Sequence, residues 1–276
     1  MQYHGRDYGG VVEDARIQRL RLIIREMESV LVAFSGGVDS ALVLKVAHEE
    51  LGARAVAFTA ISPTFPPEEQ EQAQKFTKEL GVRHFLVDSY ELEREEYAQN
   101  RGDRCYFCKD ELFALAQETA IQRGYAWVVD GTIVDDLGGH RPGLQAAEEH
   151  RIRHPLLEAD FDKQLVRSMA KSMGLPTWNK PSFACLGSRF PVGTRVTADR
   201  LLQVQHIESF LRMIGICQFR ARWHLLENKK MLRIEVSQED MPLLFSEGIR
   251  ESLIELAKEQ GFFWVTLDLI PYGIRS

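Results

Sequence analysis

Short apolar runs alternate with longer amphipathic stretches through the first 174 residues of the chain. Apolar runs of this length are typical of buried strands, and amphipathic stretches that end at a Gly are typical of helices. The pattern predicts strands over residues 29–34, 53–61, 83–87 and 127–129, with a further strand over 154–157, and helices over 39–51, 66–80, 109–123 and 162–173. Strands that alternate with helices in this way indicate an α/β fold, in which a parallel sheet carries helices on both faces.

The pattern changes after Gly174, where residues 175–196 are rich in Pro, Gly, Ser and Thr and follow no clear period. Beyond this segment we expect helices over 198–214 and 241–259 and strands over 218–224, 231–236 and 262–269. This order predicts a smaller α/β domain with mainly antiparallel pairing. We therefore expect two domains, one over residues 1–185 and one over residues 186–276.

Composition and charge narrow the class of protein. Of the 276 residues, 45% are hydrophobic and 27% are charged, which is typical of a soluble globular protein. The formal net charge of −6 argues against a protein that mainly coats nucleic acid, because such proteins are usually basic. No apolar run is long enough to cross a bilayer and the polar N-terminus does not resemble a signal peptide, so we expect a cytoplasmic protein without a membrane partner.

The strongest local signal is the run Ser35-Gly36-Gly37-Val38-Asp39-Ser40, between a predicted strand and a predicted helix. Gly36 and Gly37 permit a tight turn whose amides, with the helix N-terminus, face an anion. Ser35 and Ser40 add hydroxyl donors, and Asp39 suits a loop that also holds Mg²⁺. The run fits neither a Walker loop nor a dinucleotide-binding loop. It resembles the SGGxDS loop of the ATP pyrophosphatase (PP-loop) superfamily, whose members cleave ATP between the α- and β-phosphates; an ordinary Ser/Gly turn is the alternative.

Three of the four cysteines are candidates for metal chemistry, since four are too few for a disulfide scaffold. Cys105 and Cys108 form a Cys-x-x-Cys pair, a spacing that lets two sulfurs converge on one metal or form a redox pair. Cys185 lies in the irregular segment, whereas Cys217 lies in an apolar run and is expected to be a small buried side chain. Three thiolates do not complete a zinc site without a histidine, but they suffice for a [4Fe-4S] cluster with one open iron, which can bind a substrate or an extra sulfide.

The order of the motifs along the chain resembles one family. Besides the phosphate loop, the resemblance rests on residues 103–109, 141–144, 180–189, 219–224 and 265–269. Together they resemble the LarE-type ATP-dependent sulfur transferases over nearly the whole chain. The resemblance implies a nucleotide substrate, pyridinium-3,5-biscarboxylate mononucleotide, whose carboxylates are adenylated and converted to thiocarboxylates. The product leads to the nickel-pincer nucleotide cofactor of lactate racemase, and residues 186–276 would form the substrate-binding domain.

Members of this family obtain sulfur in two ways. One kind has a single cysteine at the position of Cys185 and surrenders its own sulfur, leaving dehydroalanine. The other kind holds a [4Fe-4S] cluster through three cysteines, and the open iron carries an exchangeable sulfide from a sulfide donor. Because Cys105, Cys108 and Cys185 are all present, the chain resembles the cluster kind, with ATP, Mg²⁺ and the cluster as cofactors.

Several arginines are candidates to bind the phosphate of the substrate. Arg220 and Arg222 are two residues apart on a predicted strand and therefore share one face. Arg189, with the hydroxyl of Ser188, is a third candidate, because guanidinium groups bind phosphate oxygens bidentately.

Five further residues complete the predicted site. Glu208 and Glu235 match acidic positions of the family's substrate site, although a solvated helix face and an exposed strand position are the alternatives. Lys109 follows the cysteine pair and is expected to stabilise phosphate or adenylate charge, or else to be a solvated lysine. Thr59 lies near the end of the predicted strand over 53–61, and Gly131 follows the predicted strand over 127–129. Open α/β folds bind ligands at this edge of the sheet.

Other functions share parts of this pattern. A tRNA thiolase can join a PP-loop to a three-cysteine cluster, but the net charge of −6 and the lack of further zinc-ribbon cysteines oppose it. An ammonia-using amidotransferase shares the loop without needing the cysteines, and a sensor would bind ATP without turnover. Members of the family can be hexameric, which leaves a homo-oligomer open for this chain.

Overall fold

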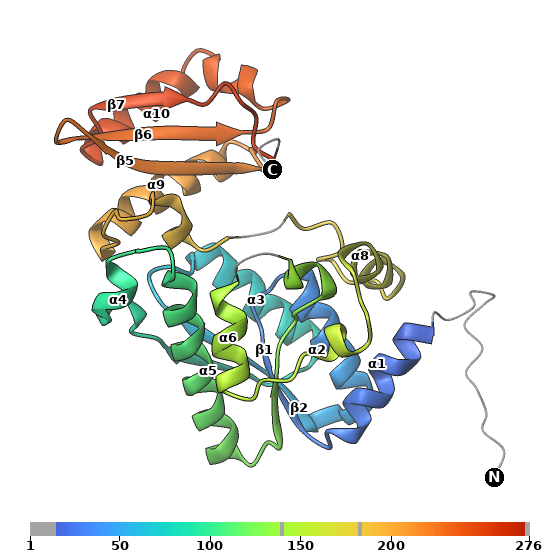
Figure 1. Cartoon of the computed structure of the whole chain (residues 1–276). Coiled ribbons are helices and arrows are strands. Elements are labelled where there is room, and N and C mark those ends of the chain that lie inside the picture. The colour runs from blue at the N-terminus through green and yellow to red at the C-terminus, as the bar shows by residue number, and fades with distance from the viewer. Residues whose placement is uncertain (1–14, 139–140, 182–183, 274–276) are drawn as a thin grey trace, which may run out of the picture.

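A four-stranded parallel sheet and the helices that cover it form the larger part of the molecule. The computed structural model describes residues 15–138, 141–181 and 184–273. The strand order is β3-β2-β1-β4, with bounds β1 Val30–Ala33, β2 Ala55–Ile61, β3 His84–Asp88 and β4 Trp127–Val129. Every pairing in this sheet is parallel, and helices cover both faces (Figure 1). The predicted α/β fold is therefore confirmed.

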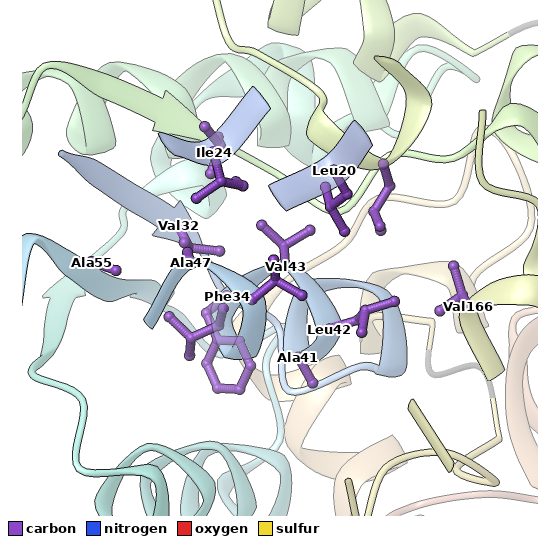
Figure 2. Close-up of a cluster of buried hydrophobic side chains, with 14 of the residues drawn as sticks. Leu20, Ile24, Val32, Phe34, Ala41, Leu42, Val43, Ala47, Ala55 and Val166 are labelled. Carbon is purple, nitrogen blue, oxygen red and sulfur yellow. The ribbon is translucent and has the colours of Figure 1, made fainter. Parts of the chain in front are cut away.

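The alternation of side chains along β1 explains why both faces are covered. Val30 and Val32 belong to one buried cluster, whereas Leu31 between them belongs to another. The helices over the first cluster are α1 Ala15–Glu26, α2 Val38–Leu51, α3 Pro67–Leu80, α7 Pro155–Glu158 and α8 Lys163–Ser172. Those over the second are α5 Arg104–Arg123 and α6 Pro142–Glu149. Figure 2 shows part of the first cluster, where Ile24 of α1 and Val43 of α2 gather with Val32.

A second, three-stranded sheet follows in the order β5-β6-β7. Its strands are β5 Phe219–Leu226, β6 Lys229–Val236 and β7 Trp264–Leu267, and its helices are α9 Ala198–Met213 and α10 Ile249–Glu259. The predicted antiparallel pairing holds for β5 and β6, whereas β7 runs parallel to β6 because α10 carries the chain back between them. In Figure 1 this sheet lies at one end of the molecule, with α9 between it and the larger sheet. The first sheet falls within residues 1–185 and the second within 186–276, and the division into two domains stays a prediction.

Two predicted elements are wrong. Residues 154–157 belong mostly to α7 rather than to a strand, because Pro155 begins a helical turn, and only a single bridge between Val129 and Arg153 extends the sheet there. The helix predicted over 241–259 is interrupted at Gly248, whose φ of 84° separates a 3-10 turn, Met241–Phe245, from α10.

The pattern also missed helices. α1 and α6 were not predicted, nor was the short α4, Glu95–Ala98. α5 begins at Arg104, ahead of the predicted start at residue 109, so the cysteine pair lies inside its first turns. The remaining 3-10 turns are Gly52–Arg54, Glu91–Glu93, Val134–Leu137 and Leu186–Arg189. None of the described helices is both long and apolar enough to span a membrane.

Gly131 allows the chain after β4 to pass directly against the start of α2. A Cβ atom on Gly131 would lie 2.7 Å from the amide nitrogen of Ser40 and 2.9 Å from the carbonyl carbon of Asp39. The buried carboxylate of Asp130 fixes this turn, since it accepts hydrogen bonds from the amide and hydroxyl of Thr132 and lies 2.7 Å from Nδ1 of His154. The end of β4 therefore supports the first turn of α2.

We predict that Gly131→Ala lowers the free energy of unfolding by about 1–3 kcal/mol, because the added methyl group meets backbone rather than a flexible side chain. Guanidinium denaturation measures the change. Gly138→Ala is the matched control, since Gly138 has a φ of −79° and a Cβ there would meet no described atom within 4 Å. Equal losses in the two variants would contradict the explanation by close approach.

Candidate functional site

The phosphate loop lies between the end of β1 and the start of α2. Gly36 has a φ of 71°, and the Oγ atoms of Ser35 and Ser40 are 3.2 Å apart. The amide of Gly37 donates to Oγ of Ser35 over 3.3 Å, which folds the loop back on itself before α2 begins. α2 has 14 residues and starts at Val38, and the N-terminus of such a helix with its preceding loop is suited to an anion.

A cavity of about 390 Å³ opens beside this loop. Its lining comes from the loop, the ends of β2 and β3, the start of α5 and the segment before Leu186. Among the predicted site residues the lining includes Ser35, Gly37, Asp39, Cys105, Cys108, Lys109 and Cys185. The fold thus brings the phosphate loop and the three candidate cysteines to the walls of one cavity.

Two lysines that motif analysis did not assign bring positive charge to the loop. Nζ of Lys163, the first residue of α8, donates to both carboxylate oxygens of Asp39 over 2.7 and 2.6 Å. Nζ of Lys180 donates to Glu69 over 2.7 Å and to the carbonyl oxygen of Gly36 over 3.2 Å. Both lysines line the cavity. Lys180 lies in a segment that carried the family resemblance, whereas Lys163 belongs to no motif and only its fold neighbours reveal it.

The loop that carries Cys185 is tied to the helix that carries the cysteine pair. The guanidinium of Arg104, the first residue of α5, donates to the carbonyl oxygen of Gly187 and to Oδ1 of Asn100. The amide of Leu186 donates to the carbonyl oxygen of Thr64 over 3.0 Å. Within the described ranges no three His, Cys, Asp or Glu side chains converge closely enough to hold a single metal ion.

The electrostatic surroundings of Cys108 favour the protonated thiol. Burial raises the pKa of this thiol, and the nearby Cys185 and Glu91 raise it further. Glu91 is 2% exposed and accepts hydrogen bonds from the hydroxyls of Ser62, Thr64 and Ser89. A metal bound at Cys108 would therefore displace a proton.

A second cavity, of about 270 Å³, lies next to the first and shares Glu69, Lys180 and Pro181 with it. Arg189 and Glu208 contribute to its wall as a buried pair, with N–O distances of 2.7 and 3.0 Å. Glu208 also accepts the amide of Ala221 over 3.0 Å. The interpretation of Glu208 as a solvated helix residue is wrong, since the residue is 2% exposed.

The two strand arginines differ in their partners. Arg222 donates to both oxygens of Glu235 over 3.0 and 3.1 Å and to the carbonyl oxygen of Ser188 over 3.0 Å. Arg220 lines the second cavity, with its Cζ 5.0 Å from the ring centroid of Tyr272, and it has no carboxylate partner in the described part of the chain. Glu235 is 7% exposed, so its interpretation as an exposed strand residue is also wrong. Of the two arginines, Arg220 is the one whose charge faces a cavity.

Other predicted residues lie at or beside the cavities. Thr59 is outside both linings, because its hydroxyl donates to the carbonyl oxygen of Phe34 over 2.5 Å and contacts Nε2 of His84 at 2.8 Å. Oγ of Ser188 accepts from Arg189 over 2.8 Å. Cys217 was predicted to be buried and is exposed on the wall of the second cavity, because it follows the turn at Gly215 rather than a strand.

Comparison with known proteins agrees with this arrangement. Residues 19–121, which include the phosphate loop, match the asparagine synthase family model. The chain is 41% identical to an uncharacterized protein of Synechocystis over 94% of this chain and 95% of the relative. It is 37% identical to the pyridinium-3,5-bisthiocarboxylic acid mononucleotide synthase of Lactiplantibacillus plantarum over 92% of this chain and 89% of the relative.

Other relatives match only part of the chain. The argininosuccinate synthase of Agrobacterium fabrum is 32% identical over 100 residues, which is 36% of this chain and 21% of that protein. The similarity to the Lactiplantibacillus synthase, by contrast, extends over most of both proteins. The chain belongs to the LarE-type family of ATP-dependent sulfur transferases, within the PP-loop superfamily.

Proposed function

We propose that this enzyme uses ATP to convert the carboxylates of pyridinium-3,5-biscarboxylate mononucleotide into thiocarboxylates, as a step in nickel-pincer nucleotide biosynthesis in the cytoplasm. The observation that carries the proposal is the shared cavity, whose walls hold both the phosphate loop and three cysteines. The name of the Lactiplantibacillus relative supports the choice of substrate.

The first step is adenylation. A carboxylate oxygen of the substrate attacks the α-phosphorus of ATP, and the bond to pyrophosphate breaks. The loop amides of residues 36–40 would stabilise the negative charge that develops on the departing pyrophosphate, together with Lys163 and Lys180, which contact this loop. Mg²⁺ would bind with the help of Asp39 and offset phosphate charge, in exchange for the present contact of Asp39 with Lys163.

The second step transfers sulfur. A sulfide attacks the carbonyl carbon of the acyl-adenylate, and AMP leaves with the electron pair of the broken C–O bond. The donor set fits a [4Fe-4S] cluster, because three soft sulfur side chains line one cavity, from α5 and from the segment next to it. Ligands of such a cluster bind different iron atoms, so they need not converge as ligands of one ion must. When bound, a cluster with one open iron would supply an exchangeable sulfide taken from an external donor.

The second cavity suits the phosphate of the substrate. Arg220 and Arg212 both line it, and the shared wall at Lys180 joins it to the phosphate loop. A nucleotide whose phosphate binds Arg220 can therefore extend its pyridinium ring toward the first cavity. Arg222, held by Glu235 and Ser188, would support the wall rather than bind the phosphate.

We predict that turnover releases AMP and pyrophosphate, and only when the dicarboxylate nucleotide is present. Lys180→Met should lower the rate about 10²-fold, by analogy with the loss of one donor from a charge-stabilising site. Coupled pyrophosphate detection measures the rate, and chromatography of the nucleotides identifies the products. Lys78→Met, on the exposed side of α3, is the control and should retain the full rate. Release of ADP and phosphate would contradict the proposed function.

We predict that Cys105→Ala, Cys108→Ala and Cys185→Ala each abolish or loosen cluster binding after anaerobic reconstitution, because each removes one of three thiolates. Cys217→Ala is the matched control and should bind iron and sulfide like the native protein, since Cys217 lines the other cavity. Iron and sulfide analysis, together with the visible spectrum, measures how much cluster each variant binds.

The intact mass after turnover identifies the source of sulfur. The native chain should make several thiocarboxylates per polypeptide without losing mass. A loss equal to one H₂S would instead show that Cys185 surrenders its sulfur, and would leave the cysteine pair without the proposed role.

We predict that Arg220→Ala weakens binding of the substrate nucleotide at least about tenfold and leaves ATP binding unchanged, because it removes a charge-assisted hydrogen bond from the second cavity only. Calorimetric titration of each nucleotide measures this. Arg250→Ala, which removes an exposed arginine of α10 paired with Glu251, is the control. Unchanged affinity for the substrate in Arg220→Ala would move the phosphate site elsewhere.

A further inference from the structure

Tyr97 carries a buried hydroxyl that the fold does not satisfy. The residue lies on α4, is 0% exposed, and its Oη has no hydrogen-bond partner among the described residues. Leaving a buried donor without a partner costs about 1–3 kcal/mol, so such groups usually have an acceptor. The position of the hydroxyl indicates which acceptor it has.

The Tyr97 side chain contributes to the wall of the first cavity, which also carries the cysteines. Tyr97 is part of the lining together with Cys105, Cys108 and Cys185. A Cβ atom on Gly187 would lie 2.6 Å from Oη of Tyr97, so the hydroxyl lies against the backbone two residues after Cys185. A larger residue at position 187 would displace it.

Neighbouring residues hold the ring in this position. Cζ of Arg104 is 5.9 Å from the centroid of the Tyr97 ring, and the same guanidinium donates to the carbonyl oxygen of Gly187. The ring packs in the buried cluster of the second sheet, with Leu186 and Phe190. The hydroxyl is therefore fixed between the helix that carries Cys105 and Cys108 and the loop that carries Cys185.

The hydroxyl acts as a donor at this place. Burial raises the pKa of Tyr97, and the nearby Cys185, Cys108 and Glu91 raise it further, while Arg104 has the opposite effect. The carboxylate of Glu91 is already surrounded by three hydroxyl donors. No described group accepts a hydrogen bond from the Tyr97 hydroxyl, and the three cysteines line the same cavity as Tyr97. Hydrogen bonds to sulfur help to set the reduction potentials of iron–sulfur clusters.

We propose that the Tyr97 hydroxyl donates a hydrogen bond to a sulfur atom of the iron–sulfur cluster bound by Cys105, Cys108 and Cys185. This inference rests on the proposed function, because it requires that cluster. The bond stabilises negative charge on the sulfur, so it favours the reduced cluster and strengthens retention of anionic sulfide.

The variant Tyr97→Phe removes the hydroxyl and keeps the ring. Tyr106→Phe is the matched control, because Tyr106 lies next to Cys105 in the first turns of α5 but its hydroxyl donates to Glu149, which does not line the cavity. The native chain and both variants are reconstituted anaerobically with iron and sulfide. Resonance Raman spectra in H₂O and D₂O then report whether an exchangeable proton is bonded to a cluster sulfur, and a redox titration followed by EPR gives the potential.

We expect the native chain and Tyr106→Phe to show Fe–S frequencies that shift in D₂O. Tyr97→Phe should lose part of this shift, have a lower reduction potential, and bind added sulfide about tenfold more weakly. Without the cluster, Tyr97→Phe should unfold at the same or a higher denaturant concentration than the native chain, since it removes a buried donor that has no partner.

The outcomes separate this inference from the proposed function. If the native chain binds no cluster, the proposed source of sulfur fails and this inference fails with it, whereas release of AMP and pyrophosphate still tests the proposed conversion separately. If it binds a cluster whose spectra and potential do not change in Tyr97→Phe, this inference alone is wrong. A large loss of stability in cluster-free Tyr97→Phe would show that the hydroxyl is bonded within the fold or to a buried water, which also overturns it.

Discussion

The parallel pairing of β1 with both β2 and β4 determines where chemistry can take place in this protein. Strands that run in the same direction end at the same edge, so the loops after β1, β2, β3 and β4 meet there. The phosphate loop follows β1, the hydroxyls around Glu91 follow β2 and β3, and Gly131 follows β4. Since Gly131 passes within contact distance of Ser40 and Asp39, the end of β4 also fixes the first turn of α2. The first cavity is lined by residues that follow β1, β2 and β3 at this edge of the sheet.

Contacts that are distant along the chain then bring the sulfur side chains to the nucleotide site. Arg104 and Gly187 are 83 positions apart, and their hydrogen bond ties the start of α5 to the segment that carries Cys185. Lys180 ties the same segment to the carbonyl oxygen of Gly36, 144 positions away. One segment therefore contacts both the loop and the cysteine helix, which gives a physical basis for activating a carboxylate and delivering sulfur within one cavity.

Charge pairing separates supporting residues from those free to bind a ligand. Arg189 pairs with Glu208 in the wall of the second cavity, and Arg222 pairs with Glu235 between β5 and β6. A buried pair is costly to break because it leaves one charge without a partner, so these residues are suited to hold the wall. Arg220 faces the second cavity without a carboxylate partner in the described ranges, and a phosphate can bind there without breaking an existing pair.

The sequence by itself determined the α/β fold, the phosphate loop and the cysteine pair. It also determined that Arg220 and Arg222, two positions apart on one strand, share a face. These features depend on local periodicity and on motifs of a few residues. It was wrong where local signals compete, as at residues 154–157, where Pro155 starts a helix within an apolar run. Only the tertiary structure decided that Lys163 contacts Asp39, that Glu208 is buried against Arg189, and that Cys217 is exposed. It alone also placed the Tyr97 hydroxyl beside Gly187. Each of these depends on packing between segments tens of residues apart, and no local pattern encodes which segments meet.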